Sequence, residues 1–141
     1  MTGRALVLAF LAFLLLFSAG LWWAQTYAWW QEVEGLETVE IAGAPVAVSD
    51  YRGLRGDSSP LKLRGCFTLD EAPEAPPAED PAPLTTPGWF DCFDAARLGA
   101  DLEAGRARAL LAERDDPEGF DRVVALYPDG RAYLWRQLRE E

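Results

Sequence analysis

The chain has 141 residues and a formal net charge of −10 at pH 7, a length sufficient for one small domain beside a membrane segment. An acidic surface repels phosphate groups, so this composition disfavours binding to nucleic acid. Histidine is absent, which excludes a Ser-His-Asp triad, an imidazole base and a histidine-ligated metal. A P-loop motif is absent as well. We predict no cofactor and no metal site.

Residues 5–24 form an almost purely apolar run without a charged side chain. A helix of this length spans about 30 Å, close to the thickness of a hydrocarbon core. A lone segment in lipid satisfies its backbone groups by forming a helix. We therefore predict a transmembrane anchor over residues 1–30, with the lipid bilayer as its partner. Cleavage as a signal peptide at Ser18-Ala19-Gly20 is the alternative, which the length of the run disfavours.

The charges on either side of the apolar run predict its orientation. Arg4 is the basic residue that precedes it, and every acidic residue follows it, beginning with Glu32. The positive-inside rule then predicts a single-pass protein of the inner membrane with a cytoplasmic N-terminus and a periplasmic C-terminal domain. Aromatic side chains at the far end of the run are predicted to lie at the membrane interface. They are Trp22, Trp23, Tyr27, Trp29 and Trp30.

Residues 31–141 predict an α+β domain with a mostly antiparallel sheet and one or two short helices. Alternating apolar residues indicate a two-stranded unit over residues 39–48 and a strand over residues 61–69. A β-hairpin is expected over residues 123–135, turning at Pro128-Asp129-Gly130. Its strands are apolar on both faces, which favours a central place in the sheet.

Helical structure is expected in the rest of the domain. The acidic residues 31–40 are interpreted as a spacer or the end of an extended helix, and Ser49-Asp50 as the cap of one helical turn. Asp91 is predicted to cap a helix that ends at Gly105. A second short helical piece is expected over residues 106–113.

Residues 70–88 carry six of the ten prolines together with five acidic residues. Such a segment buries too little apolar surface to offset its ordering entropy, and proline cannot donate to a β-ladder. We predict a solvated surface loop of polyproline II character, and we expect its replacement to leave the domain's stability nearly unchanged.

Cys66 lies on the predicted strand 61–69, and Cys92 at the predicted start of a helix. In an extracytoplasmic domain, a single pair of cysteines most simply forms a disulfide. The alternative is thiol-redox or copper chemistry, because a thiol at a helix N-terminus has a lowered pKa. The absence of a C-x-x-C motif and of a methionine cluster disfavours this alternative.

Three stretches carry a family resemblance: Asp57–Pro60 followed by Arg64–Phe67, Gly88–Asp94, and Asp121–Ala125 followed by Pro128–Arg131. With these stretches, the chain resembles a family of short alphaproteobacterial single-pass membrane proteins to which no activity is assigned. The resemblance extends over nearly the whole chain and implies no functional residue. Some relatives are labelled histidine kinases, a label that a chain of this length without histidine does not support.

These observations lead to two hypotheses about function. The first is a non-catalytic, membrane-anchored accessory protein that binds another envelope or membrane protein. The second is a thiol-redox or copper-handling envelope factor that uses Cys66 and Cys92. A truncated sensor is disfavoured because no cytoplasmic output region is visible.

Overall fold

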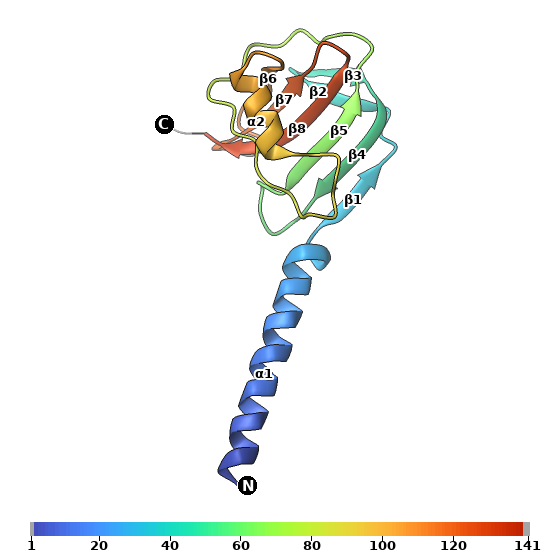
Figure 1. The fold of residues 1–141 in the computed structure, drawn as a ribbon. Coiled ribbons are helices and arrows are strands. Elements are labelled where there is room, and N and C mark those ends of the chain that lie inside the picture. The colour runs from blue at the N-terminus through green and yellow to red at the C-terminus, as the bar shows by residue number, and fades with distance from the viewer. Residues whose placement is uncertain (1, 140–141) are drawn as a thin grey trace. The chain divides into compact units, whose positions relative to one another are not determined.

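The structure, a computed structural model, describes residues 2–139 and divides the chain into two compact units, Met1–Trp30 and Gln31–Glu141 (Figure 1). As predicted from the sequence, an N-terminal apolar helix is followed by an α+β domain with an antiparallel sheet.

The first unit is helical from Gly3 to Ala28. Helix α1 (Gly3–Trp23) begins after Thr2, whose hydroxyl oxygen accepts a hydrogen bond from the N–H of Ala5, and continues into a π-helical turn, η1 (Ala24–Ala28). Together they form one stretch, Gly3–Ala28, that is long and apolar enough to cross a membrane by length and composition. Large apolar side chains are exposed along α1, as expected for a helix whose natural surroundings are lipid.

The second unit contains a six-stranded antiparallel sheet with the strand order β1-β4-β5-β8-β7-β6 (Figure 1). It also contains a separate two-stranded ribbon, β2-β3. The strands are β1 (Gln31–Glu34), β2 (Thr38–Ile41), β3 (Ala44–Ala47), β4 (Ser49–Arg55), β5 (Leu63–Thr68), β6 (Arg108–Glu113), β7 (Phe120–Leu126) and β8 (Arg131–Leu138). The predicted ribbon is confirmed, and the predicted hairpin β7–β8 lies inside the sheet, as its apolar faces indicated.

The β2–β3 ribbon covers one face of the sheet, which we call the ribbon face. Val39 and Ile41 of β2 enter a core cluster with Phe67, Val124 and other buried side chains of the sheet. The ribbon is also tied to β6 by a hydrogen bond of 2.7 Å from the N–H of Ala42 to the carbonyl oxygen of Ala112. Burial of this apolar surface is the main source of the domain's stability.

Tyr51 lies across two glycines on the ribbon face. A Cβ atom built on Gly53 would be 2.7 Å from Cε1 of Tyr51, and one built on Gly65 would be 3.1 Å from the Tyr51 hydroxyl oxygen. Gly53 and Gly65 are cross-strand partners in β4 and β5. The two glycines therefore provide the space in which the aromatic ring packs flat on the sheet.

The opposite face is covered by helix α2 (Ala95–Glu103) and by the long connection from β5 to this helix, so we call it the connection face (Figure 1). Phe93 packs edge-on against Tyr133 and Trp135 of β8, with ring centroids 6.1 and 6.2 Å apart. Phe90 and Leu98 are buried as well. The sheet thus lies between two covering layers.

Several local predictions were wrong because tertiary pairing outweighed the local pattern. Residues 31–34 form β1, a strand paired with β4, and not a spacer. Tyr51 and Leu54 have a helical spacing, but they belong to β4, where the alternation of side chains along a strand puts them on opposite faces of the sheet. Residues 106–113 contain β6, which pairs with β7. Helix α2 is capped by Asp94, whose side chain accepts from the N–H of Arg97, and not by Asp91.

The proline-rich connection is packed against the domain more closely than predicted. The N–H of Leu111 donates to the carbonyl oxygen of Pro76 at 2.8 Å, and the N–H of Ala78 donates to that of Ala109 at 3.0 Å. Residues 76–78 therefore cover the outer edge of β6. The carbonyl groups around the prolines still accept hydrogen bonds, which is why proline did not prevent this contact.

Candidate functional site

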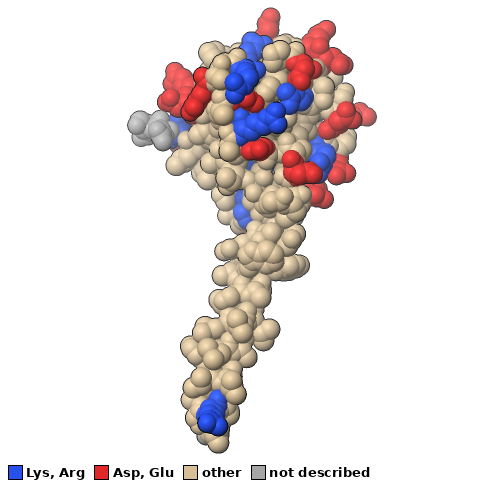
Figure 2. Space-filling model, viewed as in Figure 1, with Lys and Arg blue, Asp and Glu red and all other residues tan. Residues whose placement is uncertain are grey.

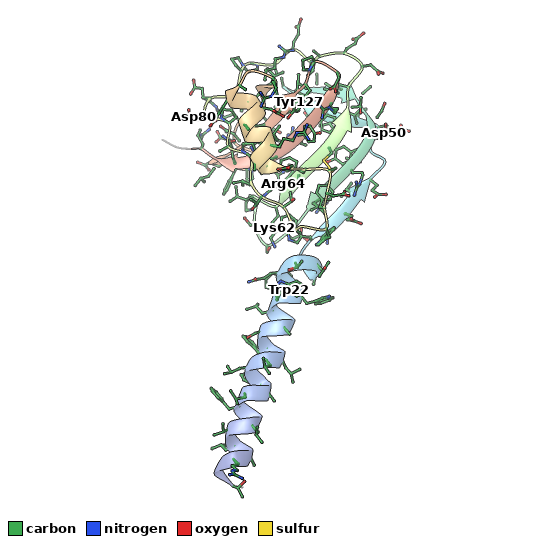
Figure 3. All side chains as sticks on the ribbon, viewed as in Figure 1. Trp22, Asp50, Lys62, Arg64, Asp80 and Tyr127 are labelled. Carbon is green, nitrogen blue, oxygen red and sulfur yellow. A yellow bond between two sulfur atoms is a disulfide. The ribbon has the colours of Figure 1, made fainter. Side chains whose placement is uncertain are left out.

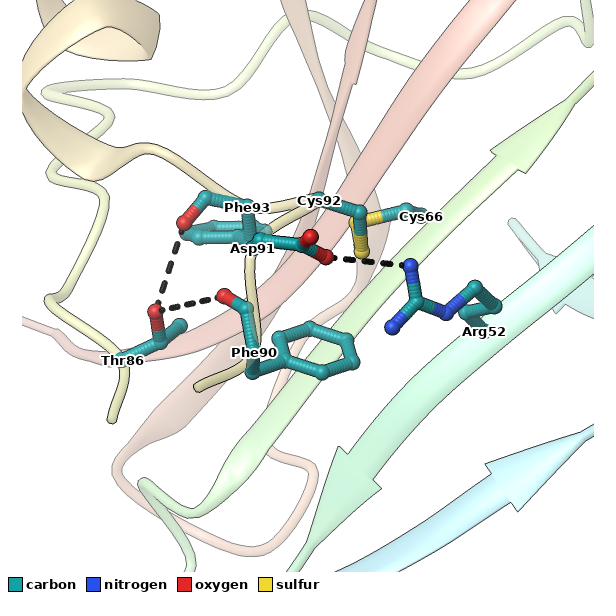
Figure 4. The surroundings of a disulfide bond; sticks show 7 residues. All are labelled: Arg52, Cys66, Thr86, Phe90, Asp91, Cys92 and Phe93. Atoms are coloured by element: carbon teal, nitrogen blue, oxygen red, sulfur yellow. Dashed lines mark hydrogen bonds and ion pairs between the residues drawn. A yellow bond between two sulfur atoms is a disulfide. The ribbon is translucent and has the colours of Figure 1, made fainter. Parts of the chain in front are cut away.

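Cys66 and Cys92 form a disulfide, as predicted, with their Cα atoms 6.3 Å apart (Figure 4). Cys66 is buried in the middle of β5, and Cys92 is half-buried in the turn before α2. The bond therefore attaches the end of the long connection to the connection face of the sheet.

The residues on either side of Cys92 explain why this turn docks there. Phe90 and Phe93 are both buried against the sheet, whereas Asp91 between them is exposed. The hydroxyl of Thr86 lies 3.4 Å from the carbonyl oxygen of Phe90 and 3.3 Å from that of Phe93, and donates to them (Figure 4). Two aromatic anchors and a side-chain bond to the backbone thus define the turn around the cysteine.

An ion pair closes over the disulfide on its solvent side. Nη1 of Arg52 is 3.2 Å from Oδ1 of Asp91, and its guanidinium carbon lies 5.5 Å from the ring centroid of Phe90 (Figure 4). Both charged side chains are substantially exposed, so the pair contributes at most about 1 kcal/mol. Its effect is to position Arg52 beside the disulfide.

Arg64 is a second arginine at this site. It alternates with the apolar residues of the predicted strand 61–69, and its side chain is buried on the connection face (Figure 3). It donates to the carbonyl oxygens of Leu63, Leu84 and Thr85 at 2.7, 3.2 and 3.0 Å, and also to that of Leu61. Burial lowers the pKa of Arg64 to about 10. Arg64 therefore clamps the connection onto β5.

Gln137 is a comparable clamp on β8. Its Oε1 accepts from the N–H of Ala82 at 2.8 Å and from Nε1 of Trp135 at 2.9 Å, while its Nε2 donates to the carbonyl oxygen of Asp80 at 3.1 Å. A buried amide of this kind stabilises when its groups are all satisfied. No sequence signal linked Gln137 to a segment more than 50 residues away.

Asp101 of α2 is a buried carboxylate that the sequence analysis also missed. Its side chain accepts from the hydroxyl of Tyr127 and, at 2.7 Å, from Nε of Arg106. The tyrosine hydrogen bond, followed by that from Arg106, lowers the pKa of Asp101. Burial and the same hydrogen bond raise the pKa of Tyr127 to about 12. The cluster therefore holds an ionised aspartate and a neutral tyrosine at neutral pH, and ties α2 to the β7–β8 turn.

Asp115 and Asp116, two adjacent acidic residues in the loop between β6 and β7, belong to a cluster of ion pairs. Asp116 contacts Nη1 of Arg122 and Nε of Arg136, both at 3.1 Å. Asp115 pairs with Arg139 and accepts from the N–H of Gly119. These contacts anchor the β6–β7 loop to the end of the sheet, so the carboxylates are occupied in holding the fold.

The domain surface has several open hollows with mixed polar and apolar linings. A pocket of about 180 Å³ adjoins the disulfide and is lined by Asp91, Cys92, Asp94, Arg97, Leu98, Tyr127, Arg131 and Tyr133. A groove of about 540 Å³ lies at the end of the sheet next to the β7–β8 turn. In Figure 2, acidic side chains are spread over the domain, and the basic ones in view lie close to them. No group of three residues able to hold a metal ion is present among residues 2–139.

The predicted interfacial aromatic residues lie together at one end of the helical unit. Trp22 and Trp23 end α1, Tyr27 lies in η1, and Trp29 and Trp30 follow. The rings of Trp22 and Tyr27 are in edge contact, with centroids 6.0 Å apart, and Nε1 of Trp30 donates to the carbonyl oxygen of Gln25. Trp22 is labelled in Figure 3.

Comparison with known proteins identified a family whose model covers almost the entire domain. The model of a family of unknown function, DUF6446, matches residues 33–141. Neither the curated proteins nor the solved structures contain a match to this chain. The chain belongs to the family of unknown function DUF6446.

Proposed function

We propose that this chain is a single-pass membrane protein whose domain works outside the cytoplasm as a non-catalytic accessory protein that binds another envelope or membrane protein. One observation carries the proposal: an apolar helix of membrane-spanning length precedes a folded domain that contains a disulfide. Disulfides persist in oxidising compartments such as the periplasm. A domain of this kind on a single anchor is suited to act on a neighbour in the same membrane.

The proposed orientation follows from charge. Arg4 lies before the apolar run, and the first acidic side chains, Glu32 and Glu34, lie just after it. Basic residues are retained on the cytoplasmic side of the inner membrane, so the domain is assigned to the periplasm. The aromatic group from Trp22 to Trp30 is then assigned to the headgroup layer on the periplasmic side.

Binding is favoured over catalysis by how the charged side chains are used. Arg64 and Asp101 are buried, and Asp116 contacts two arginines. Each of these three groups joins two parts of the fold. An active site instead requires an acid, base or nucleophile that faces a cavity and is poised near the working pH. The polar groups described above support the domain's shape.

A pull-down of the intact protein in mild detergent tests this proposal. We expect a single envelope or membrane protein at a fixed ratio to the tagged chain, and its absence when an unrelated tagged single-pass protein is used. Recovery of the chain alone, or with only the proteins found in the control, would contradict the accessory role.

The thiol-redox alternative has one specific observation in its favour. Cys92 is half-buried and lines the small pocket that also contains Arg97 and Arg131, so it is the more exposed of the two cysteines. A partner thiolate attacking Sγ of Cys92 would form a mixed disulfide and release Cys66 as a thiolate. However, α2 begins at Ala95 and is capped by Asp94, so Cys92 lacks the helix N-terminus that would lower its pKa.

A further inference from the structure

The six-stranded sheet has two edge strands, β1 and β6, and only the outer side of β6 is paired with another described segment. Residues 76–78 of the connection cover the edge at β6 through the backbone hydrogen bonds to Ala109 and Leu111. The edge at β1 is different: among residues 31–139, no segment pairs with the outer side of Gln31–Glu34 (Figure 1). An unpaired edge strand is a template for pairing with another chain.

The side chains along this edge determine what kind of chain can pair there. Glu32 and Glu34 are exposed on β1, while Val33 packs toward the ribbon-face core. The end of β1 leads into an open groove of about 590 Å³, which is lined by Glu34, Gly35, Leu36, Glu37, Val48, Asp50, Tyr51 and Arg52. Figure 3 labels Asp50 beside this edge of the sheet. Glu34, Glu37 and Asp50 are all exposed, so the groove at the end of β1 carries three carboxylate side chains.

The groove's single basic side chain is already engaged, because Arg52 is paired with Asp91. Leu36, which is 42% exposed, adds an apolar surface beside the acidic side chains. A second copy of the chain fits poorly on this edge, because two paired β1 strands would bring the carboxylates of Glu32 and Glu34 from both copies together. Like charges at close range on a ladder destabilise it.

We propose that the outer edge of β1 binds an extended, basic segment of a partner protein, which adds a strand to the sheet and places lysine or arginine beside Glu32, Glu34 and Glu37. Main-chain hydrogen bonds supply the pairing, and the alternating basic side chains supply the selectivity. This inference rests on the proposed accessory function and assigns a surface to it.

A designed peptide tests this surface on the full chain in nanodiscs of zwitterionic lipid. The probe is an end-capped octapeptide in which lysine alternates with valine. A matched control has the same residues with alternate backbone nitrogens methylated, which preserves charge but removes hydrogen-bond donors. We expect the probe to bind and to protect the amides of residues 31–34 from hydrogen exchange. N-methylation should weaken its binding at least tenfold.

Charge is tested separately by substitution. The double variant E32Q/E34Q should bind the probe at least tenfold more weakly, because both residues are exposed and their loss leaves the fold intact. The matched control E103Q/E118Q neutralises two exposed carboxylates elsewhere on the domain and should bind like the wild type. Equal affinity for both peptides, or protection confined to residues outside β1, would overturn the edge assignment. Dimerisation of the chain through β1 would overturn it as well.

The pull-down distinguishes this inference from the function on which it rests. If the envelope partner co-purifies with wild type but not with E32Q/E34Q, both stand. If the partner co-purifies equally with both, the accessory function stands and the β1 assignment fails. If no partner is recovered with wild type, the accessory function fails.

Discussion

Loss of the Cys66–Cys92 bond should destabilise the domain without unfolding it at room temperature. The cysteines are 26 residues apart in sequence, and closing a loop of this length lowers the free energy of folding by about 3.5 kcal/mol through the entropy of the unfolded chain. In a domain of roughly 110 residues, this corresponds to a fall in Tm of about 15 °C.

The structure gives a reason for the native fold to survive reduction. Phe90, Phe93, Arg64 and Gln137 hold the connection in place independently of the sulfur bond. Loss of the bond therefore acts mainly by increasing the conformational entropy of the unfolded chain. The variants Cys66→Ala and Cys92→Ala and the double variant should lose similar amounts of folding free energy. Urea denaturation of oxidised, reduced and variant protein, followed by circular dichroism, measures the difference.

The alternative role of the two cysteines predicts a different response to reduction. If the cysteines serve redox or copper chemistry, reduced protein should be nearly as stable as oxidised protein. Cys92 should then react rapidly with iodoacetamide at pH 7, with a thiol pKa well below about 8.5. An unchanged melting curve on reduction together with such reactivity would refute the structural role.

Three further perturbations test the fold and its clamps. Replacing residues 72–82 with a Gly/Ser linker of equal length should reduce stability by at least about 2 kcal/mol, because flexible residues weaken the contacts with Gln137 and β6; a loss well below 1 kcal/mol in urea denaturation would show that the segment is solvated after all. Gly53→Ala should cost about 1–3 kcal/mol through overlap with the Tyr51 ring, and a Tyr51→Ala background should remove most of that cost; equal costs in both backgrounds would argue against the packing described. Asp101 has a lowered pKa in the folded protein, so its ionised form contributes stability at neutral pH that is lost as the pH falls below 3.8 toward that lowered value. The stability gap between wild type and Asp101→Asn should therefore be smaller at pH 3 than at pH 7, and a constant gap would contradict this.

The fold was predictable where the local pattern and the tertiary environment agree. Residues 123–135 are apolar on both faces around a Pro-Asp-Gly turn, and they form the buried hairpin β7–β8. Residues 5–24 are apolar on every side and form a helix. The disulfide followed from the count of two cysteines, because a single pair has one possible pairing.

The remaining elements depend on partners distant in sequence, which a local pattern does not reveal. In β6, Leu110 and Leu111 are adjacent and resemble a helical segment, but they face opposite sides of the sheet because β7 pairs along the strand. Arg64 has the spacing of a solvent-facing residue, yet its hydrogen bonds go to the carbonyl groups of Leu84 and Thr85. The clamps around the disulfide were missed for the same reason.

A reporter fusion tests the proposed topology, the central claim of this account, most directly. A phosphatase that is active only in an oxidising compartment, fused after Glu141, should be active in intact cells. The fusion protein should remain in the membrane fraction after the membranes are washed with alkaline carbonate. An inactive fusion would reverse the orientation inferred from Arg4 and the acidic residues that follow the helix, and would place the domain in the cytoplasm. Release of an active, soluble fusion that begins near Leu21 would show that the apolar helix is cleaved and does not anchor the protein.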